Sequence, residues 1–118
     1  MMRYIVILFL SCFFSSLNAE ERKDDRLKYH TTLEEALKEA SKKNKPVFFN
    51  CYADWSGACH LMDSVVLADP QLVSFIKKRC VPLRVDMVST VEGRQLADKY
   101  QVKYFAHFLI LDSKGDVI

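Results

Sequence analysis

The sequence predicts an α/β fold in which a mixed central sheet lies between two layers of helices. Amphipathic segments alternate along the chain with short apolar runs, and such runs are typical of strands that are buried on both faces of a sheet. The chain has 118 residues, half of them apolar, so it has room for one domain and enough apolar surface to form a core.

Four segments have the spacing or the caps of helices. The first is expected over about 33–43, where Thr32 and Glu35 can form a capping box. The second follows Trp55, and the third begins at Pro70 after the N-cap Asp69. A fourth is expected over 91–100. The apolar residues expected on one buried face of the second helix are Ala58, Cys59, Met62, Val65 and Val66.

Three apolar runs predict strands at about 47–53, 81–87 and 107–111. A tight turn is expected over 112–115, and 116–118 then begins an antiparallel hairpin partner at the edge of the sheet. Residues 27–30 are a candidate for a short edge strand. The phenylalanines interpreted as core are Phe48, Phe49, Phe75, Phe105 and Phe108.

The first nineteen residues have the pattern of a secretory signal peptide. Arg3 is followed by an apolar run from Tyr4 to Phe14, and then by a stretch of small and polar residues that ends at Ala19. The run has about half of the roughly 20 residues that span a bilayer, so an uncleaved membrane anchor is the alternative. We expect a signal peptide over 1–19, a charged leader with the candidate edge strand over 20–30, and one domain over 31–118.

The net charge and the cysteine content limit the functions that the chain can have. The net charge is +2 and no basic stripe carries interleaved aromatic residues, so nucleic-acid binding is not expected. Cleavage after Ala19 would leave three cysteines, Cys51, Cys59 and Cys80, in an oxidising compartment. Three is an odd number, so at least one thiol stays free or bonds another molecule.

Four short motifs carry a family resemblance: Lys45-Pro46-Val47, the segment from Tyr52 to Cys59, Asp69-Pro70 and Val85-Asp86. With them the chain resembles the C-terminal periplasmic thioredoxin-like domain of membrane thiol:disulfide interchange proteins and, more widely, disulfide-isomerase-like thioredoxins. The resemblance covers about 31–118. It implies a thioredoxin-like three-layer sandwich, a periplasmic or secreted location, and protein thiols or disulfides of exported clients as partners, with a membrane thiol:disulfide interchange protein as a candidate redox partner.

The resemblance also locates a degenerate active site. The family uses Cys-x-x-Cys at a helix N-terminus, where the first cysteine attacks a client disulfide and the second resolves the mixed disulfide. Here the motif reads Ser56-Gly57-Ala58-Cys59, so Ser56 replaces the attacking cysteine and only the resolving one survives. Asn50 stands where the family commonly has a buried Asp, and Ala106 where it has a cis-proline. Because a non-proline cis bond costs about 2.5–4 kcal/mol, we expect a trans bond before Ala106.

The remaining cysteines leave two interpretations open. Cys59 can form a mixed disulfide that has no internal route of resolution, or it is a packed thiol without a partner. Cys51 and Cys80 are expected near opposite ends of the sheet, so their Cα atoms lie farther apart than the limit of about 7 Å for a disulfide. We interpret both as buried free thiols.

The resemblance implies that a client would lie against Trp55, Gly57, Ala58, Ala106 and His107. His60 and His107 could approach the Cys59 thiol, but their spacing defines no ligand set, so we expect neither a metal nor another cofactor. The family normally ends with a helix after the terminal hairpin, whereas this sequence stops at Ile118. We therefore expect the terminal helix to be missing, and the uncovered sheet face to favour self-association.

Two functions follow from these residues. The first is an exported thiol–disulfide interchange protein of the disulfide-isomerase-like type that forms mixed disulfides through Cys59. The alternative is a redox-inactive thioredoxin-fold protein that binds clients in a chaperone-like way.

Overall fold

The computed structural model describes residues 26–118, so the predicted signal peptide and most of the charged leader lie outside the described residues. Within residues 26–118, three strands form one sheet in the order β2-β1-β3. The central strand β1 (Val47–Tyr52) runs parallel to β2 (Val81–Asp86) and antiparallel to β3 (His107–Leu111). The predicted mixed sheet is confirmed.

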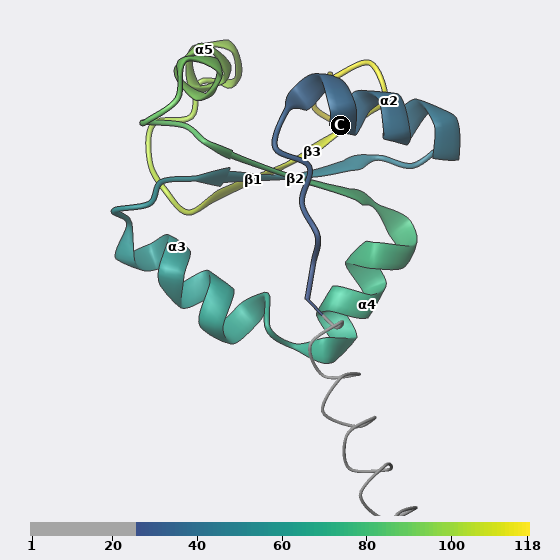
Figure 1. Cartoon of the computed structure of the whole chain (residues 1–118), viewed down its shortest axis with the longest axis horizontal. Coiled ribbons are helices and arrows are strands. Elements are labelled where there is room, and N and C mark those ends of the chain that lie inside the picture. Colours follow the sequence, from purple (N-terminus) through teal and green to yellow (C-terminus); the bar gives the residue numbers. More distant parts are fainter. Residues whose placement is uncertain (1–25) are drawn as a thin grey trace, which may run out of the picture.

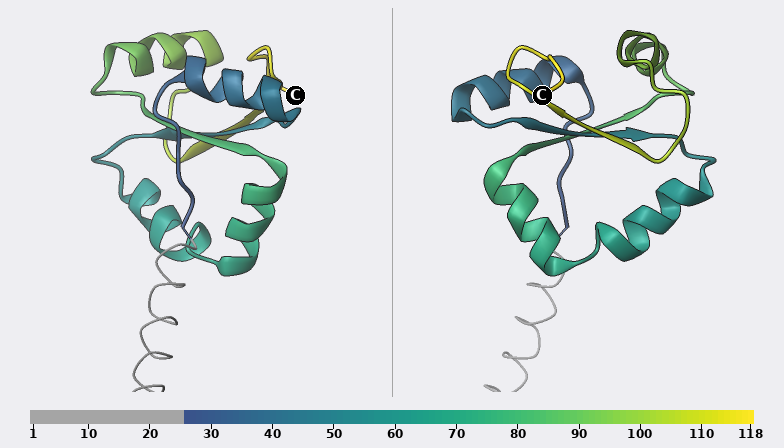
Figure 2. Two further views of the ribbon diagram at one scale, coloured as in Figure 1. Left: turned by 45° about the vertical axis from the view of Figure 1, so that its right-hand side comes forward. Right: turned by 180° about the vertical axis from the view of Figure 1, so that it is seen from behind.

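Helices cover both faces of this sheet. Helices α2 (Leu33–Lys43) and α5 (Val91–Tyr100) lie on one face, and α3 (Gly57–Leu61) and α4 (Pro70–Arg79) lie on the other (Figure 1). Two further views show the same three layers (Figure 2). The predicted three-layer sandwich is therefore confirmed. Among residues 26–118, no helix has the length and hydropathy needed to cross a bilayer.

Local signals in the sequence set the bounds of the helices. The Thr32 side chain accepts a hydrogen bond from the Glu35 backbone N–H at 3.3 Å and caps α2, which ends at Asn44 in a left-handed conformation (φ 53°). The Asp69 carboxylate caps α4 by accepting from the Gln71 N–H at 3.1 Å. Both predicted N-caps are confirmed, whereas the structure shows only the Thr32 half of the predicted capping box, and the Glu35 carboxylate lies 3.9 Å from the His30 ring.

The hydrophobic core lies between the sheet and the α2–α5 layer. Alternate residues of each strand point to this face because successive side chains of a strand alternate. The strand residues of this core are Val47, Phe49, Cys51, Val81, Leu83, Val85 and Leu111, and their partners from helices and loops include Ala36, Ala40, Met87, Leu96 and Val102. The opposite sides of the same strands are less deeply buried.

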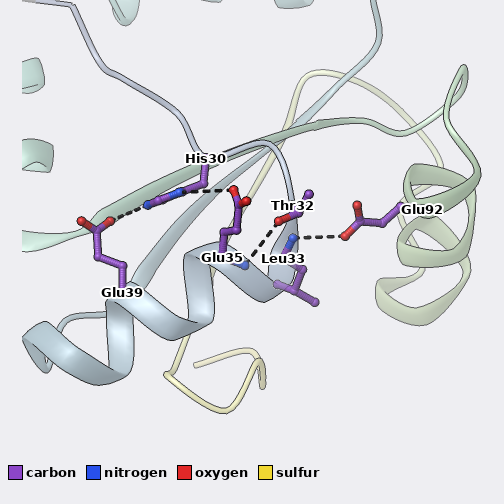
Figure 3. Close-up of polar contacts among 6 residues, drawn as sticks. All are labelled: His30, Thr32, Leu33, Glu35, Glu39 and Glu92. Atoms are coloured by element: carbon purple, nitrogen blue, oxygen red, sulfur yellow. Dashed lines mark hydrogen bonds and ion pairs between the residues drawn. The ribbon is translucent and has the colours of Figure 1, made fainter.

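The segment before α2 joins the sheet and the helix layer. His30 pairs with β2 through a single parallel bridge at Leu83, so the predicted edge strand over 27–30 is reduced to this one residue. The His30 ring lies 2.6 Å from the Glu39 carboxylate and 3.9 Å from that of Glu35 (Figure 3). The same figure shows the Leu33 N–H donating to Glu92 at 3.1 Å, which ties the start of α2 to α5.

Two packing predictions were wrong. Of the five residues expected on one buried face after Trp55, only Cys59 is buried, and Val65 and Val66 are exposed. The reason is the π-helical turn η1 (Met62–Val66), in which Leu67 N–H donates to the Met62 carbonyl, because the wider turn changes the direction in which later side chains point.

Phe75 is also not part of the core, since its side chain is 56% exposed. Helix α4 packs through Val73 and Ile76, which leaves Phe75 outside the buried stripe. The guanidinium of Arg79 lies over its ring instead, 5.2 Å from the ring centroid.

Candidate functional site

Ser56 is the N-cap of α3. Its side-chain oxygen accepts a hydrogen bond from the Cys59 backbone N–H at 3.3 Å, and its residue is buried. The Ser56 N–H donates in turn to the Ala53 carbonyl at 3.0 Å, which holds the turn between β1 and α3. At the position where the sequence resemblance led us to expect an attacking sulfur, the Ser56 hydroxyl closes the first turn of a helix. A hydroxyl is scarcely ionised at neutral pH, so it cannot replace a thiolate.

Cys59 is a free thiol in that same first turn, and only 2% of its residue is exposed. A thiolate must approach a disulfide sulfur directly before exchange can begin. Reaction at Cys59 therefore requires local opening of the α3 turn or a client that inserts against it.

The two other described cysteines do not complete a redox pair. Cys51 pairs with Val85 near the end of β1, whereas Cys80 precedes Val81 at the start of β2. All three described cysteines are free, and the predicted separation of Cys51 from Cys80 is confirmed. Burial raises the pKa of Cys51 to about 12, and the neighbouring Cys59 adds to the shift, so the Cys51 thiol stays neutral. Burial also raises the pKa of Cys80.

Trp55, Gly57 and Ala58, three of the residues expected to contact a client, lie at the start of α3 and are exposed. Trp55 is 70% exposed, and its ring meets that of Phe105 edge to face at 6.0 Å. Gly57 and Ala58 are exposed, and a Cβ atom placed on Gly57 would meet nothing within 4 Å. The structure thus places the loop before Ala106 against the Trp55 side of the motif.

The Phe105–Ala106 peptide bond is cis, so the expectation of a trans bond was wrong. The expectation rested on the preference of an isolated non-proline peptide bond for the trans form, which does not include the contacts of the surrounding loop. On one side of the bond Phe105 packs against Trp55, and on the other His107 begins β3.

The two histidines near the motif have other contacts. His60 Nε2 lies 2.6 Å from the Asp54 carbonyl oxygen, and its ring meets Tyr52 edge to face. His107 packs its ring against Tyr104, with 6.2 Å between centroids. Across residues 26–118, no three His, Cys, Asp or Glu side chains gather in a way that could hold a metal ion.

A hollow of about 610 Å³ lies beside Trp55. Its lining includes Tyr52, Val88 and the carboxylates of Asp54, Asp86 and Glu92. Burial alone would raise the pKa of Asp86, but hydrogen bonds from the Ser89 and Val88 backbone N–H groups have the larger combined effect. The pKa of Asp86 is therefore below its usual value, and the carboxyl group is charged.

Sequence reasoning missed the arginine that lies beneath the motif. The Arg84 guanidinium is stacked between Tyr29 and Tyr52, at 4.4 and 4.5 Å from their ring centroids, and forms an ion pair with Asp63 of η1. In the amide orientation that satisfies its neighbours, the buried Asn50 oxygen accepts hydrogen bonds from Arg84 at 2.9 and 3.3 Å. The signal was present in the sequence, since Arg84 is the one basic residue inside the apolar run over 81–87.

The hydrogen bonds from Arg84 limit the chemistry that the Asn50 side chain can perform. A neutral amide cannot accept and release a proton in the way a carboxylate can, and here its oxygen is already occupied by Arg84. The structure thus supplies a fixed positive charge and a fixed amide below α3 in place of a titrating acid.

The fold and the position of the Ser56–Cys59 turn define an α/β protein of the thioredoxin type. A family model described as thioredoxin-like matches residues 28–113, and the chain belongs to this family. Over 71 residues it is 32% identical to the thiol:disulfide interchange protein DsbD of Pseudomonas fluorescens. That match covers 59% of this chain and only 12% of the relative, so the chain spans a small part of it.

Solved structures agree with the family. A candidate disulphide-isomerase from Bacteroides thetaiotaomicron is similar with a TM-score of 0.70 and 30% identity, over 79% of this chain and 77% of that one. A thioredoxin from Thermus thermophilus has a TM-score of 0.65 and 28% identity, over 71% and 63% of the two chains. The oxidised C-terminal domain of DsbD from Neisseria meningitidis has a TM-score of 0.60 over 77% and 85%, and at 22% identity it supports the fold alone.

Proposed function

We propose that this chain is an exported thioredoxin-fold protein of the thiol:disulfide interchange type whose single motif cysteine, Cys59, forms mixed disulfides and does not cycle. The observation that carries the proposal is the first turn of α3. There the Ser56 hydroxyl is the helix cap, at the position that the resemblance assigns to the attacking sulfur, while Cys59 is a free thiol three residues later in the same turn.

The proposed step is one thiol–disulfide exchange. The Cys59 thiolate attacks one sulfur of a client disulfide, a bond forms between Cys59 and that sulfur, and the client's other sulfur leaves as a thiolate. No electrons are gained or lost overall, because one disulfide is exchanged for another. With a hydroxyl at Ser56, release requires a thiol from the client or from a separate reductant.

Alkylation at pH 7 tests whether Cys59 is accessible to this chemistry. Cys59→Ser and Cys80→Ser form a matched pair, since each removes one thiol outside the sheet core. We expect iodoacetamide to label the Cys59-containing peptide of the native protein at a rate set by opening of the α3 turn, equally in the parent and in Cys80→Ser, and to leave that peptide unlabelled in Cys59→Ser, as read by mass spectrometry. Labelling of Cys59 only after denaturation would contradict the exchange function.

A second experiment tests the role of Ser56. The Ser56→Cys variant should reduce insulin with dithiothreitol faster than the parent chain, because it restores both sulfurs of the motif. Turnover by the parent itself at the variant's rate would show that the missing sulfur is not limiting.

The alternative is a redox-inactive client-binding protein, and one observation favours it. The aromatic side chain of Trp55, beside the motif, is 70% exposed and packs against Phe105, whereas the Cys59 thiol is itself buried. Aggregation of an unfolded client that still contains disulfides, such as lysozyme with scrambled disulfides, separates the two functions. Suppression that is lost in Trp55→Ala but retained in Cys59→Ser supports binding without exchange, whereas the reverse supports the mixed disulfide.

Export and partners complete the proposal. The charged, apolar and small-residue order of residues 1–19 supports a periplasmic or secreted location, with exported protein thiols or disulfides as clients and a membrane thiol:disulfide interchange protein as a candidate partner. A mature chain that begins at Glu20 is the expected result of N-terminal sequencing. A chain that retains Met1 in the membrane fraction would favour the uncleaved anchor.

Self-association is part of the same proposal. On the α3–α4 face of the sheet, Phe48 and Phe108 are half-buried and Ile110 is exposed, which leaves apolar surface for a second copy of the chain. We expect sedimentation velocity to show concentration-dependent dimers or larger species. A monomer at all concentrations would contradict this expectation.

A further inference from the structure

Cationic side chains gather at the end of the molecule opposite the Ser56–Cys59 turn. We call this surface the lysine end, and it is made of Lys28, Lys42, Lys43, Lys45, Lys77, Lys78 and Arg79. Four of these lysines line one hollow of about 280 Å³ together with Cys80 and the start of β2. The lysine end is therefore a surface built from three separate segments of the chain, and not a run in the sequence alone.

The topology explains why the charges meet. Helices α2 and α4 both end where β1 and β2 begin, on the right-hand side of Figure 1. Each helix carries basic residues in its last turn, Lys42 and Lys43 in α2 and Lys77 to Arg79 in α4. The last carbonyls of a helix favour cations, so both helix ends and their side chains suit this placement.

Within residues 26–118, the carboxylates near the lysine end are fewer than its cations. Glu39 lies in the same hollow, but it is held between Lys43 Nζ at 2.8 Å and the His30 ring at 2.6 Å. Asp112 and Asp116 follow β3 nearby, and the Asp112 carboxylate accepts from the Lys114 and Asp116 backbone N–H groups. Among residues 26–118, the seven cations of the lysine end thus outnumber these three carboxylates, although the whole chain has a net charge of only +2.

An aromatic ring accompanies the cations. Phe75 is exposed on the outer side of α4, where it shares a shallow hollow with Lys78 and Arg79. An apolar aromatic side chain beside Lys and Arg is the composition of a surface that enters the headgroup region of a bilayer. Six of the seven cations are lysines, which act as point charges and suit a diffuse negative surface better than paired recognition of single carboxylates.

We propose that the lysine end docks on a bilayer of anionic phospholipids, with Phe75 in the headgroup region. Because Lys45 precedes the first residue of β1 and Ser56 follows its last, docking leaves the Ser56–Cys59 turn on the side away from the bilayer. The inference concerns the opposite end of the molecule and holds whether or not Cys59 exchanges disulfides.

Vesicle sedimentation of the full chain tests the proposal with matched variants. Lys28→Gln/Lys78→Gln removes two charges from the lysine end, and Lys99→Gln/Lys103→Gln removes two from the region of α5. Both pairs are exposed and change the net charge equally. The N-terminal apolar run is the same in every variant, and vesicles of phosphatidylcholine alone measure what it contributes.

On vesicles with 30% phosphatidylglycerol we expect the first pair to weaken partitioning about 25-fold, or about fivefold per lysine, because one lysine near an anionic surface contributes about 1 kcal/mol. The second pair should weaken it less than threefold. Phe75→Ala should weaken binding severalfold with its far-UV circular dichroism unchanged, and 0.5 M NaCl should abolish the preference for anionic vesicles.

Three results would overturn the proposal. The first is equal partitioning of the parent on neutral and anionic vesicles, which would leave an acidic protein as the partner of the lysine end. The second is an equal loss in both double variants, which would show a net-charge effect with no specific surface. The third is an unchanged partitioning in Lys28→Gln/Lys78→Gln.

Discussion

The two faces of the central sheet differ in what their strands present. Toward α2 and α5 the strands present apolar side chains that are almost fully buried, such as Phe49 and Leu83. Toward α3 and α4 the neighbouring positions carry Phe48, Asn50 and Arg84, of which only Asn50 is fully buried. One face therefore holds the fold together by apolar burial, and the other combines partial burial with the polar cluster under the Ser56–Cys59 turn.

The largest expected effect compares two adjacent phenylalanines of β1. Phe49→Ala should lower the free energy of unfolding by about 3–5 kcal/mol, because it opens a cavity in a well-packed core. Phe48→Ala, on the half-buried face, should cost about 1–2 kcal/mol, since little of its surface is removed from water. Urea unfolding followed by circular dichroism measures both, and similar losses would mean that the two faces contribute alike.

Two glycines provide the next comparison. A Cβ atom on Gly93 would lie 1.9 Å from the Asp86 carbonyl oxygen, so Gly93→Ala should push α5 off the end of β2 and destabilise the fold by about 2–3 kcal/mol. Gly57→Ala in α3 meets open space, and the better helix propensity of alanine should make it neutral or slightly stabilising. Thermal unfolding that ranked Gly57→Ala below Gly93→Ala would contradict this packing.

The polar cluster around Arg84 should contribute less to the free energy of unfolding than the hydrophobic core does. Arg84→Met removes the donor to the buried Asn50 oxygen and the partner of Asp63, for an expected loss of about 2 kcal/mol. Arg94→Met is the matched control, because Arg94 is exposed and donates to the Val88 carbonyl at 3.2 Å, away from this cluster. A double-mutant cycle with Asp63→Asn measures the coupling, and a coupling of zero would mean that the ion pair does not help the fold.

The smallest expected effect depends on pH. Hydrogen bonds from Lys43 and His30 hold the pKa of Glu39 below its usual value of 4.5. A carboxyl that is more acidic in the folded chain stabilises it above the unfolded pKa, and this contribution is lost as pH falls through the folded pKa. Glu39→Gln should therefore cost less than about 1 kcal/mol at pH 7 and progressively less below pH 4.5.

The control for this prediction is Asp98→Asn, an exposed carboxylate on α5. Its effect on the urea midpoint should be small at every pH. A Glu39→Gln effect that stayed constant between pH 7 and pH 3 would show that the charge of Glu39 does not contribute.

Much of the fold could be predicted because local signals and burial agree. Thr32, Asp69 and the apolar runs over 47–53 and 81–87 each act within a few residues, so composition and spacing were sufficient to locate them. The exposure of Val65, Val66 and Phe75 could not be predicted in this way. Helical spacing assumes a regular α-helix, and it contains no information about a π-helical turn or about which side of α4 meets the sheet.

Some residues of the candidate site could be predicted from the sequence, and others could not. Ser56 and Cys59 could be located from one motif, because the spacing alone puts them in one helical turn. Arg84 contacts Tyr29, Asn50 and Asp63, which are far apart in the sequence. Only the tertiary structure therefore reveals this cluster. The cis form of the Phe105–Ala106 bond likewise could not be predicted from the residue type.

The Ser56 cap gives any sulfur at this position a structural consequence. A cysteine there would be a weaker acceptor for the Cys59 N–H, since a thiol is a poor hydrogen-bond acceptor. The substitution that adds a nucleophile therefore also loosens the helical turn that would present it.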